Sequence, residues 1–315
     1  MNQDHVWTIS PVERIRHLKS FGPLTSLPLD EISLIAQHTE ECAFRAGETI
    51  LGGPQSDERP YVIVSGQVRA LADWILDEER GPGTEVGFLA SLTDRWEDLS
   101  VVAETDVLAL GISSDVLADV FEDRFPILIE AVRGMAAQSL QERQKIADGT
   151  YLAIPKRIGA LPEGFTLVDM IMMLRQADAF SGAGMKPLVR MARAVEQLRF
   201  PAGATIWTAG EESGSLFTPI VGEIECQTPD GRTFLVGPGY PMGALESTAR
   251  EPRWFDAVAK TDLIVFKSRT SEFFDMLEDH PDVALQFLGQ TAGNLVRLRS
   301  EAKKALQEET LVEAV

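Results

Sequence analysis

One stretch of sequence occurs twice in this chain, and the two copies constrain the fold more than any other feature. Residues 81–106 read GPGTEVGFLASLTDRWEDLSVVAETD, and residues 237–262 read GPGYPMGALESTAREPRWFDAVAKTD, at an offset of 156. The offset holds outside this stretch, where FRAGETI at 44–50 matches FPAGATI at 200–206. Five glycines, namely Gly47, Gly66, Gly81, Gly83 and Gly87, correspond to Gly203, Gly222, Gly237, Gly239 and Gly243. A period this long predicts two domains of like fold rather than a solenoid.

The composition indicates a soluble globular protein that is long enough for two domains. The chain has 315 residues, 44% of them hydrophobic and 24% charged, with a formal net charge of -19. Because an acidic surface repels phosphate backbones, we expect no binding to nucleic acid. The most apolar run, Met170–Leu174, is too short to cross a bilayer, and no signal peptide is recognisable at the start. These observations predict a cytoplasmic protein without membrane insertion, in which Cys42 and Cys226 are reduced thiols.

The hydrophobic periodicity changes in the same order in both halves. Apolar residues up to about residue 40 recur at helical spacing, residues 42–110 read as short strands between glycine turns, and helices follow from Ser113. Residues 151–165 contain two prolines and two glycines, which is typical of a connection. We therefore expect a first domain at residues 1–147, a linker at 148–165 and a second domain at 166–315.

The last helix, expected at about residues 283–309, has a heptad-like apolar stripe that one arginine interrupts. The stripe consists of Leu285, Leu288, Ala292, Leu295, Arg299, Ala302 and Leu306. Two interpretations remain open at this point. The helix packs on its own barrel, or it forms a seam through which two chains associate.

The order of helix, about eight short strands with a small helix among them, and closing helices resembles the cyclic nucleotide-binding domain family. FRAGETI and FPAGATI are similar to the first turn of that family, and YVIVSGQV at 61–68 is similar to its central strand and turn. GPGTEVGFLASL at 81–92 is similar to the start of its phosphate-binding cassette. The resemblance covers nearly the whole chain, twice. It implies an α+β fold of two tandem double-stranded β-helix (jelly-roll) barrels, each flanked by N- and C-terminal helices.

The resemblance also implies a ligand site in each copy. In the family, a glycine lets the backbone approach the ligand, and the N–H groups of the short helix face the cyclic phosphate. A Glu directly after the glycine holds the ribose hydroxyl, the Arg of a Pro-Arg pair contacts the phosphate, and a Ser or Thr adds a hydroxyl.

The first copy departs from this pattern. The implied site consists of Gly87, Phe88, Leu89 and Ser100. Phe88 replaces the Glu, and Glu97 stands where the phosphate-binding Arg belongs, while Arg95 comes two residues too early. Because a carboxylate repels a phosphate, we expect that this copy does not bind a cyclic nucleotide in the usual way.

The second copy keeps more of the pattern. Its implied site consists of Gly243, Ala244, Leu245, Arg253 and Asp256. Pro252-Arg253 follows Gly243 at the family spacing, but Ala244 replaces the Glu and Asp256 replaces the hydroxyl residue, with Glu246 two positions beyond the expected carboxylate. We expect an ion pair between Arg253 and Asp256 in an empty pocket rather than a working nucleotide site.

Other chemistries find no support in the sequence. The four histidines, His5, His17, His38 and His280, make no metal-ligand spacing and lie outside the predicted strands, which argues against a metal-dependent cupin. We recognise no Ser-His-Asp or Cys-His arrangement and no Walker-type loop. The chain is therefore predicted not to be an enzyme and to need no cofactor, with cAMP or cGMP as the candidate ligand.

The family's usual outputs narrow the function further. We recognise no helix-turn-helix after the second barrel, as a transcription factor would have, and no membrane spans, as a channel would have. A kinase regulatory subunit also has two tandem copies, but the pseudosubstrate run of such subunits is missing here. We predict a non-catalytic regulatory or scaffolding protein that acts through protein partners or self-association of its helices. The alternative is an allosteric sensor with cAMP, cGMP or a related phosphorylated ligand in the second domain.

Overall fold

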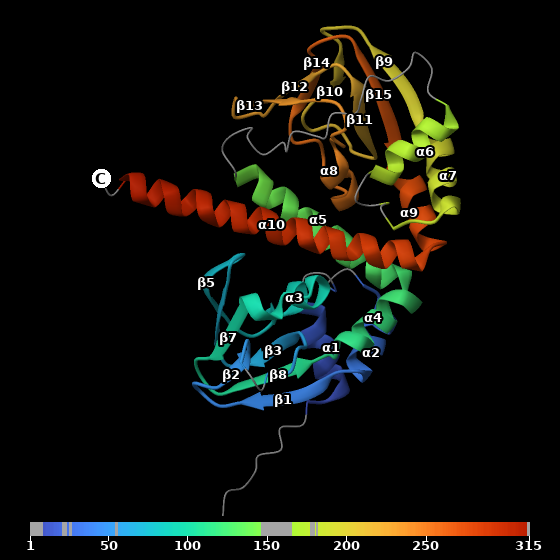
Figure 1. Cartoon of the computed structure of the whole chain (residues 1–315). Coiled ribbons are helices and arrows are strands. Elements are labelled where there is room, and N and C mark those ends of the chain that lie inside the picture. Colours follow the sequence, from blue (N-terminus) through green and yellow to red (C-terminus); the bar gives the residue numbers. More distant parts are fainter. Residues whose placement is uncertain are drawn as a thin grey trace, which may run out of the picture. The chain divides into compact units, whose positions relative to one another are not determined.

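The computed structural model describes residues 9–145 and 166–313, apart from 21–23, 25–26, 54–55, 177–179 and 181. The chain forms two compact units (Figure 1): unit 1 comprises Met1–Gly134 and Thr291–Val315, and unit 2 comprises Met135–Gln290. The linker expected at 148–165 lies outside the described residues. The division differs from the expected domains at two places, because residues from Met135 belong to unit 2 and residues from Thr291 belong to unit 1.

Within the described residues, the first repeat has two helices, eight strands that enclose a short helix, and two closing helices. In chain order these are α1 (Pro11–Ser20), α2 (Leu29–Gln37), β1 (Glu40–Phe44), β2 (Thr49–Leu51), β3 (Tyr61–Ser65), β4 (Val68–Ala72), β5 (Ile75–Arg80), β6 (Glu85–Val86), α3 (Phe88–Thr93), the 3-10 helix η2 (Trp96–Asp98), β7 (Leu99–Ala103), β8 (Val107–Gly111), α4 (Ser114–Asp123) and α5 (Phe125–Lys145).

The second repeat follows the same order. Its elements are α6 (Leu167–Gln176), α7 (Met185–Ala194), β9 (Glu196–Phe200), β10 (Thr205–Trp207), β11 (Ser215–Val221), β12 (Ile224–Gln227), β13 (Thr233–Val236), α8 (Ala244–Ala249), β14 (Asp256–Ala259), β15 (Leu263–Arg269), α9 (Thr270–Glu278) and α10 (Pro281–Glu313). The offset of 156 places α6 over α1 and α8 over α3 with identical bounds, so the repeat seen in the sequence is a repeat of structure.

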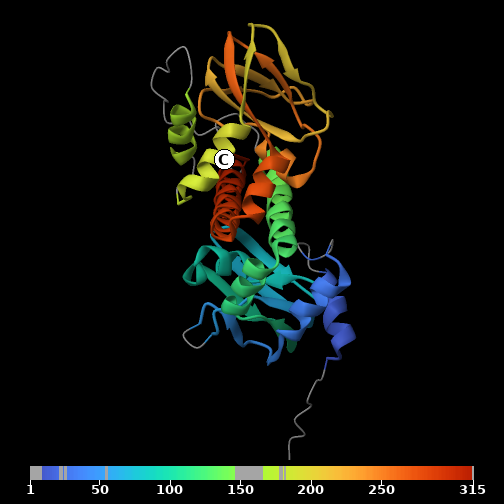
Figure 2. The same cartoon turned by 90° about the vertical axis from the view of Figure 1, so that its right-hand side faces the viewer.

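The strands of each unit form two antiparallel sheets. Unit 1 has the sheets β1-β8-β3-β6 and β2-β7-β4-β5, and unit 2 has β11-β15-β9 and β10-β14-β12-β13. The register is also repeated, since Phe44 lies opposite Val107 and Phe200 lies opposite Leu263. Figure 2 shows the strands of each unit rolled around a core, with helices of the same unit at one end. The predicted α+β fold of two barrels with flanking helices is confirmed.

The first helix of each repeat starts with a capping box, a pattern that satisfies free N–H groups of the first turn. In α1, the backbone N–H of Ser10 donates to Oε2 of Glu13 (3.0 Å), and the N–H of Glu13 donates to Oγ of Ser10 (3.3 Å). Thr166 and Asp169 repeat the arrangement before α6. The sequence shows both boxes, because a hydroxyl residue is followed three positions later by a carboxylate.

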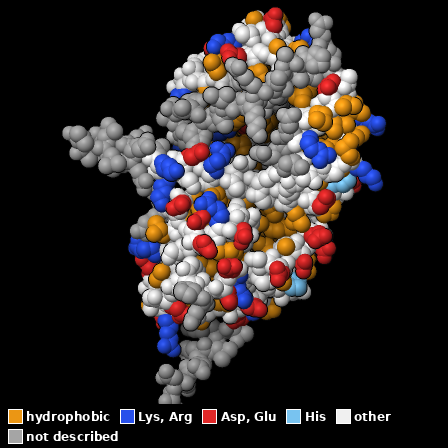
Figure 3. Space-filling model, viewed as in Figure 1, with side chains coloured by type: hydrophobic (Ala, Val, Ile, Leu, Met, Phe, Trp, Pro, Cys, Tyr) orange, Lys and Arg blue, Asp and Glu red, His pale blue; other side chains and the backbone are white. Residues whose placement is uncertain are grey.

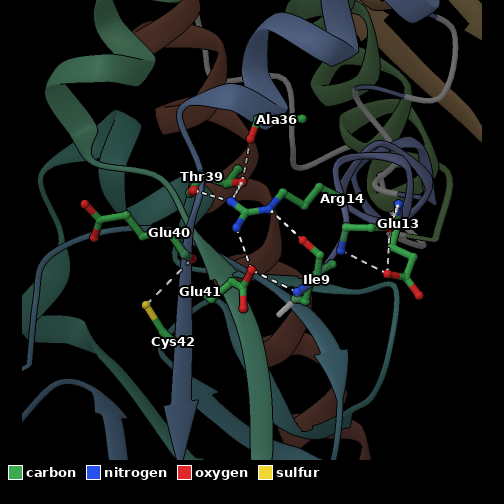
Figure 4. Close-up of polar contacts among 9 residues, drawn as sticks. Ile9, Glu13, Arg14, Ala36, Thr39, Glu40, Glu41 and Cys42 are labelled. Atoms are coloured by element: carbon green, nitrogen blue, oxygen red, sulfur yellow. Dashed lines mark hydrogen bonds and ion pairs between the residues drawn. The ribbon is translucent and has the colours of Figure 1, made fainter. Parts of the chain in front are cut away.

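One arginine ties α1 to the first strand of its barrel (Figure 4). The guanidinium of Arg14 donates to the carbonyl of Thr39 (2.6 Å) and to Oε1 of Glu41 (2.5 Å). The same carboxylate oxygen of Glu41 accepts from the backbone N–H of Ile9 (2.9 Å). These contacts fix where the chain enters the first barrel.

The closing helices divide between the two units. Helix α10 belongs to unit 1 from Thr291 onward, where Nζ of Lys303 donates to the carbonyls of Ala72 (2.8 Å) and Ile75 (3.1 Å) at the β4–β5 turn. Helix α5 belongs to unit 2 from Met135 onward. There Arg232, in the β12–β13 turn, donates to the carbonyl of Gln144 (3.0 Å). The end of α5 at Gln144 and the part of α10 around Lys303 are therefore bonded to strands or turns of the other repeat.

The interpretation that α10 packs on its own barrel therefore holds for residues 281–290, which belong to unit 2, and not for the residues from Thr291 onward. The stripe is buried at Leu288, Ala292 and Leu295, as its spacing indicated. The spacing of apolar residues predicts which face of a helix is buried, but it contains no information on which surface covers that face. Among the described residues, no helix is both long enough and apolar enough to cross a membrane.

Candidate functional site

The cassette of the second barrel starts at a glycine in a left-handed conformation. Gly243 precedes α8 with φ of 79°, which side chains with a Cβ adopt only with strain. A Cβ at this position would lie 2.0 Å from Nη1 of Arg253. Glycine is therefore required here twice over, by its backbone angle and by the guanidinium that packs against it. Ala244 and Leu245 follow in the first turn of α8, half-buried.

The side chain of Arg253 lies inside the barrel and is held by backbone carbonyls. Only 5% of Arg253 is exposed. Its Nη2 donates to the carbonyl of Ser215 (2.5 Å), and its Nη1 donates to the carbonyl of Gly243 (3.2 Å). The guanidinium carbon lies 4.2 Å from the centre of the Trp207 ring, a cation–π distance. Burial lowers the pKa of Arg253, and the nearby carboxylates of Glu246 and Glu211 oppose that shift, so the group stays charged.

The expected ion pair between Arg253 and Asp256 is wrong. Oδ1 of Asp256 accepts from the backbone N–H of Ala209 at 2.7 Å, in the loop after β10. A backbone N–H in a tight turn is a fixed donor, and it takes the carboxylate away from the guanidinium. Asp256 therefore stabilises a loop, and Arg253 bonds to carbonyl groups, with the carboxylates of Glu246 and Glu211 as its nearby negative charges.

The reasoning from sequence missed Trp207, which forms the floor under Arg253. Its indole N–H donates to the carbonyl of Phe255 (2.9 Å), and 3% of the residue is exposed. Phe217 and Phe255 pack against its ring, with centroids 5.3 and 5.5 Å away. The repeat offered a signal, because Trp207 occupies the position of Leu51 in the first copy, so this position changes from aliphatic to aromatic beside the cassette that keeps its arginine.

Glu246 supplies the buried carboxylate of this cassette. It is 2% exposed, and no residue in the described part of the chain hydrogen-bonds to its Oε1. Burial raises the pKa of Glu246, while the positive charges of Arg253 and Arg143 and a hydrogen bond from Trp254 act in the opposite direction. The sequence placed this carboxylate two positions beyond the usual one, and the structure turns it into the interior of unit 2.

The cassette of the first barrel has the same backbone and different contents. Gly87 precedes α3 with φ of 91°, and Phe88 and Leu89 are buried. The backbone N–H of Phe88 donates to Oε2 of Glu85 (3.1 Å). A Cβ at Gly87 would lie 3.0 Å from Leu51 and 3.2 Å from the ring of Trp96. Aliphatic and aromatic side chains therefore cover this glycine, where the second barrel has its arginine.

The remaining residues implied for the first site do not converge on Gly87. Glu97 and Ser100 are exposed. Arg95 does not replace the missing arginine, because its Nε donates to Oδ2 of Asp98 (2.6 Å) and its guanidinium lies over the ring of Trp74 at 4.8 Å. The structure brings Gly243 and Arg253 together, and it keeps Ser100 and Glu97 at the surface.

A small apolar cavity lies between the barrel of unit 1 and its helices. Its volume is about 30 Å³, and its lining includes Phe88, Phe121 and the edge residue Glu85. A space of this size holds one or two water molecules and no nucleotide. In the described part of the chain, no group of three or more His, Cys, Asp or Glu side chains is placed to hold a metal ion.

Comparison with known proteins found similarity in the second repeat and to two-domain structures. Residues 197–280 match the family model of the cyclic nucleotide-binding domain. A stretch of 130 residues is 25% identical to a CRP-like cAMP-activated global transcriptional regulator of Mycobacterium tuberculosis and covers 40% of this chain. The match spans 58% of that regulator, less than two thirds of its length.

Two solved structures are also similar. The regulatory subunit of a cAMP-independent protein kinase A from Trypanosoma brucei is 18% identical, with 90% of this chain and 92% of that chain covered and a TM-score of 0.33. A cyclic nucleotide-binding-like protein from Brucella abortus is 26% identical over 35% of this chain and 98% of its own, with a TM-score of 0.32. The match to the family model concerns residues 197–280, which hold the barrel of the second repeat.

Proposed function

We propose that the chain uses two domains of the cyclic nucleotide-binding kind, of which the second matches that family's model at residues 197–280, as non-catalytic regulatory or scaffolding modules. In this proposal neither cassette binds a cyclic nucleotide in the usual way. The domains act through contacts with proteins, and their cassettes serve as parts of the core. The single observation that carries the proposal is the position of Arg253, whose guanidinium is already bonded on both sides within the barrel.

The bonds of Arg253 set the free energy that a ligand must offset. Hydrogen bonds to charged groups contribute about 1.5–3 kcal/mol each. A cyclic phosphate that recruits Arg253 must break its bonds to Ser215 and Gly243 and remove it from Trp207. The family's ribose-binding carboxylate would return part of that free energy, but Ala244 stands in its place. The balance therefore favours the closed cassette.

The first cassette supports the same conclusion by other means. Leu51 and Trp96 contact the face of Gly87, which a ligand would have to approach. Phe88 is buried where the family has its ribose-binding Glu, and the exposed Glu97 replaces the phosphate-binding Arg. In the first cassette, Arg95 is bonded to Asp98 and is therefore not placed to bind a phosphate at Gly87.

The second candidate function is the sensor, and one observation favours it. Arg253 follows Gly243 at the family spacing and packs directly against it, at the start of α8. A ligand with enough additional contacts would then take over an arginine that is already close to its working position. In this version, cAMP, cGMP or a related phosphorylated ligand binds only in the second barrel.

Isothermal titration and thermal shift with cAMP, cGMP and cyclic dinucleotides, up to millimolar ligand, separate the two candidates. We expect no heat and no shift for the full chain. Binding that disappears in Arg253→Ala and persists in Arg199→Ala, an exposed arginine of β9, would establish the sensor and overturn our proposal. Binding that survives in Arg253→Ala would place a ligand elsewhere and would also overturn it.

A further inference from the structure

The two closing helices that cross between the units carry an arginine at the same place in the repeat. Arg143 in α5 and Arg299 in α10 are 156 positions apart, which is the offset of the repeat. Arg299 is the residue that interrupts the apolar stripe of its helix, and both arginines are half-buried. A guanidinium that is partly removed from water needs partners that hold its charge. The partners of the two arginines therefore indicate what this position does.

In unit 2, Arg143 lies at the start of the cassette. Its guanidinium carbon is 5.5 Å from the centre of the Tyr240 ring, a cation–π distance, and Tyr240 belongs to the repeated stretch that leads into α8. Burial raises the pKa of Glu246, and the positive charge of Arg143 is among the groups that oppose this shift. The next residue of α5, Gln144, accepts a hydrogen bond from Arg232 in the β12–β13 turn. The end of α5 is thus attached both to the cassette and to the hairpin before it.

In unit 1, the equivalent arginine of α10 acts on the equivalent cassette. Burial raises the pKa of Glu85, at the start of that cassette, and the positive charges of Arg80 and Arg299 oppose this shift. One turn later, Lys303 donates to two carbonyls at the β4–β5 turn. Figure 3 shows Lys and Arg side chains at the position of α10, toward its C-terminal end. Because β4–β5 and β12–β13 correspond in the repeat, both closing helices are attached to the same two features of a barrel.

We propose that Arg143 and Arg299 are reciprocal latches, each of which holds the closing helix of one repeat on the cassette of the other. Because a cation–π contact requires a ring within about 6 Å, a small movement of Tyr240 is enough to open the latch of α5. The barrel stays folded when this happens, since its strands are held by their own ladders. The inference goes beyond the proposed function, because it concerns how the repeats are coupled and is the same whether or not a nucleotide binds.

Hydrogen exchange of the full chain, followed by mass spectrometry, tests the latch of α5. Arg143→Met keeps a long side chain and removes the charge, so exchange at residues 135–145 should rise about tenfold while the strands of unit 2 stay protected. The matched control is Lys145→Met, the same kind of change at an exposed position that is bonded to Glu142 of its own helix. This control should change the exchange by less than about twofold.

A double-mutant cycle makes the test specific for the cassette. Tyr240→Leu should also raise exchange at residues 135–145, and it should add nothing in the Arg143→Met background, because the two changes remove one contact. In unit 1, Arg299→Met should raise exchange at residues 291–303. Arg297→Met should not, because Arg297 is exposed and is bonded to Glu301 of its own helix.

Three outcomes would overturn the proposal. The first is an equal rise in a latch variant and in its control, which would show only a loosened helix end. The second is additivity of Arg143→Met and Tyr240→Leu, which would mean that the two side chains act separately. The third is faster exchange in the strands of unit 2 as well, which would show a general loss of stability. None of these measurements involves a nucleotide, so this inference and the proposed function fail separately.

Discussion

The two barrels have the same backbone around their cassettes and close it with different chemistry. The face of Gly87 is covered by Leu51 and Trp96, and the residue at the arginine position, Glu97, is exposed to solvent. The face of Gly243 is covered by Arg253, which rests on Trp207 and on two carbonyls. Apolar side chains in the first barrel and a buried arginine in the second thus cover the corresponding glycine.

This comparison shows that the fold does not depend on one kind of contact at its centre. The left-handed glycine is kept in both copies because the backbone turn requires it. The side chains above the glycine need only fill the space and leave no polar group unsatisfied. A buried arginine meets that second condition by bonding to carbonyls, which every sequence provides.

The largest effect is expected from making the floor of the second barrel resemble that of the first. Trp207→Leu removes the hydrogen bond to Phe255 and the ring beneath Arg253, and it leaves a cavity. We expect a loss of about 2–4 kcal/mol in the free energy of unfolding of unit 2. The reverse change, Leu51→Trp, should cost unit 1 about 1–3 kcal/mol through overpacking. Urea denaturation followed by circular dichroism measures both, and a Trp207→Leu variant as stable as the natural chain would contradict the central role of Trp207.

The next effect concerns the two glycines. Gly243→Ala forces an L-residue into the left-handed region and drives its Cβ into Arg253, so we expect a loss of about 2–3 kcal/mol. Gly87→Ala has the same backbone strain and meets the end of Leu51 instead, so its loss should be about 1–2 kcal/mol. A double-mutant cycle with Arg253→Ala tests whether the clash with Arg253 causes the larger loss. In the Arg253→Ala background, Gly243→Ala should destabilise the protein no more than Gly87→Ala does. If Gly243→Ala still destabilises the protein more than Gly87→Ala in that background, Arg253 does not cause the difference.

A third prediction uses Glu246, the buried carboxylate of the second cassette. Because burial raises the pKa of Glu246, the folded state keeps its proton at a pH where the unfolded chain has released it. Stability from this group is therefore present at low pH and is lost as the pH rises above the ordinary value of 4.5. The slope for one proton is at most about 1.4 kcal/mol per pH unit. Glu246→Gln should flatten the pH dependence of the melting temperature. The corresponding residue, Ala90, carries no such charge, so Ala90→Ser serves as the control.

The smallest effect is expected from returning an arginine to the first cassette. Glu97 is exposed, so Glu97→Arg should change the free energy of unfolding by less than about 0.5 kcal/mol. It should not create binding of cAMP, because Leu51 and Trp96 still cover Gly87. Titration calorimetry of the variant is the measurement. Nucleotide binding after this single change would show that the first cassette had lost only its cation.

The sequence predicted the architecture well, for a physical reason. Repeated glycines mark turns that no other residue makes without strain, and their constant offset requires two copies of one fold. The capping boxes at Ser10 and Thr166 and the buried stripe of α10 could also be read from spacing alone. These features depend on neighbours in the chain or on periodicity, both of which a sequence contains.

The contacts of the site could not be predicted in the same way. Arg253 bonds to the carbonyls of Ser215 and Gly243, and carbonyl groups are the same in every residue type. Asp256 was the visible carboxylate nearby, yet it binds a backbone N–H that the sequence also does not distinguish. The destination of α10 depends on long-range packing between segments, on which its own pattern has no information.

The division of the closing helices has a practical consequence for anyone who separates the repeats. A break within residues 146–165 leaves the N-terminal half without Thr291–Val315, which belong to unit 1. It leaves the C-terminal half without Met135–Lys145, which belong to unit 2. Each half alone should be poorly soluble. Produced together, the halves should complement one another as a split protein does, because each holds the missing piece of the other.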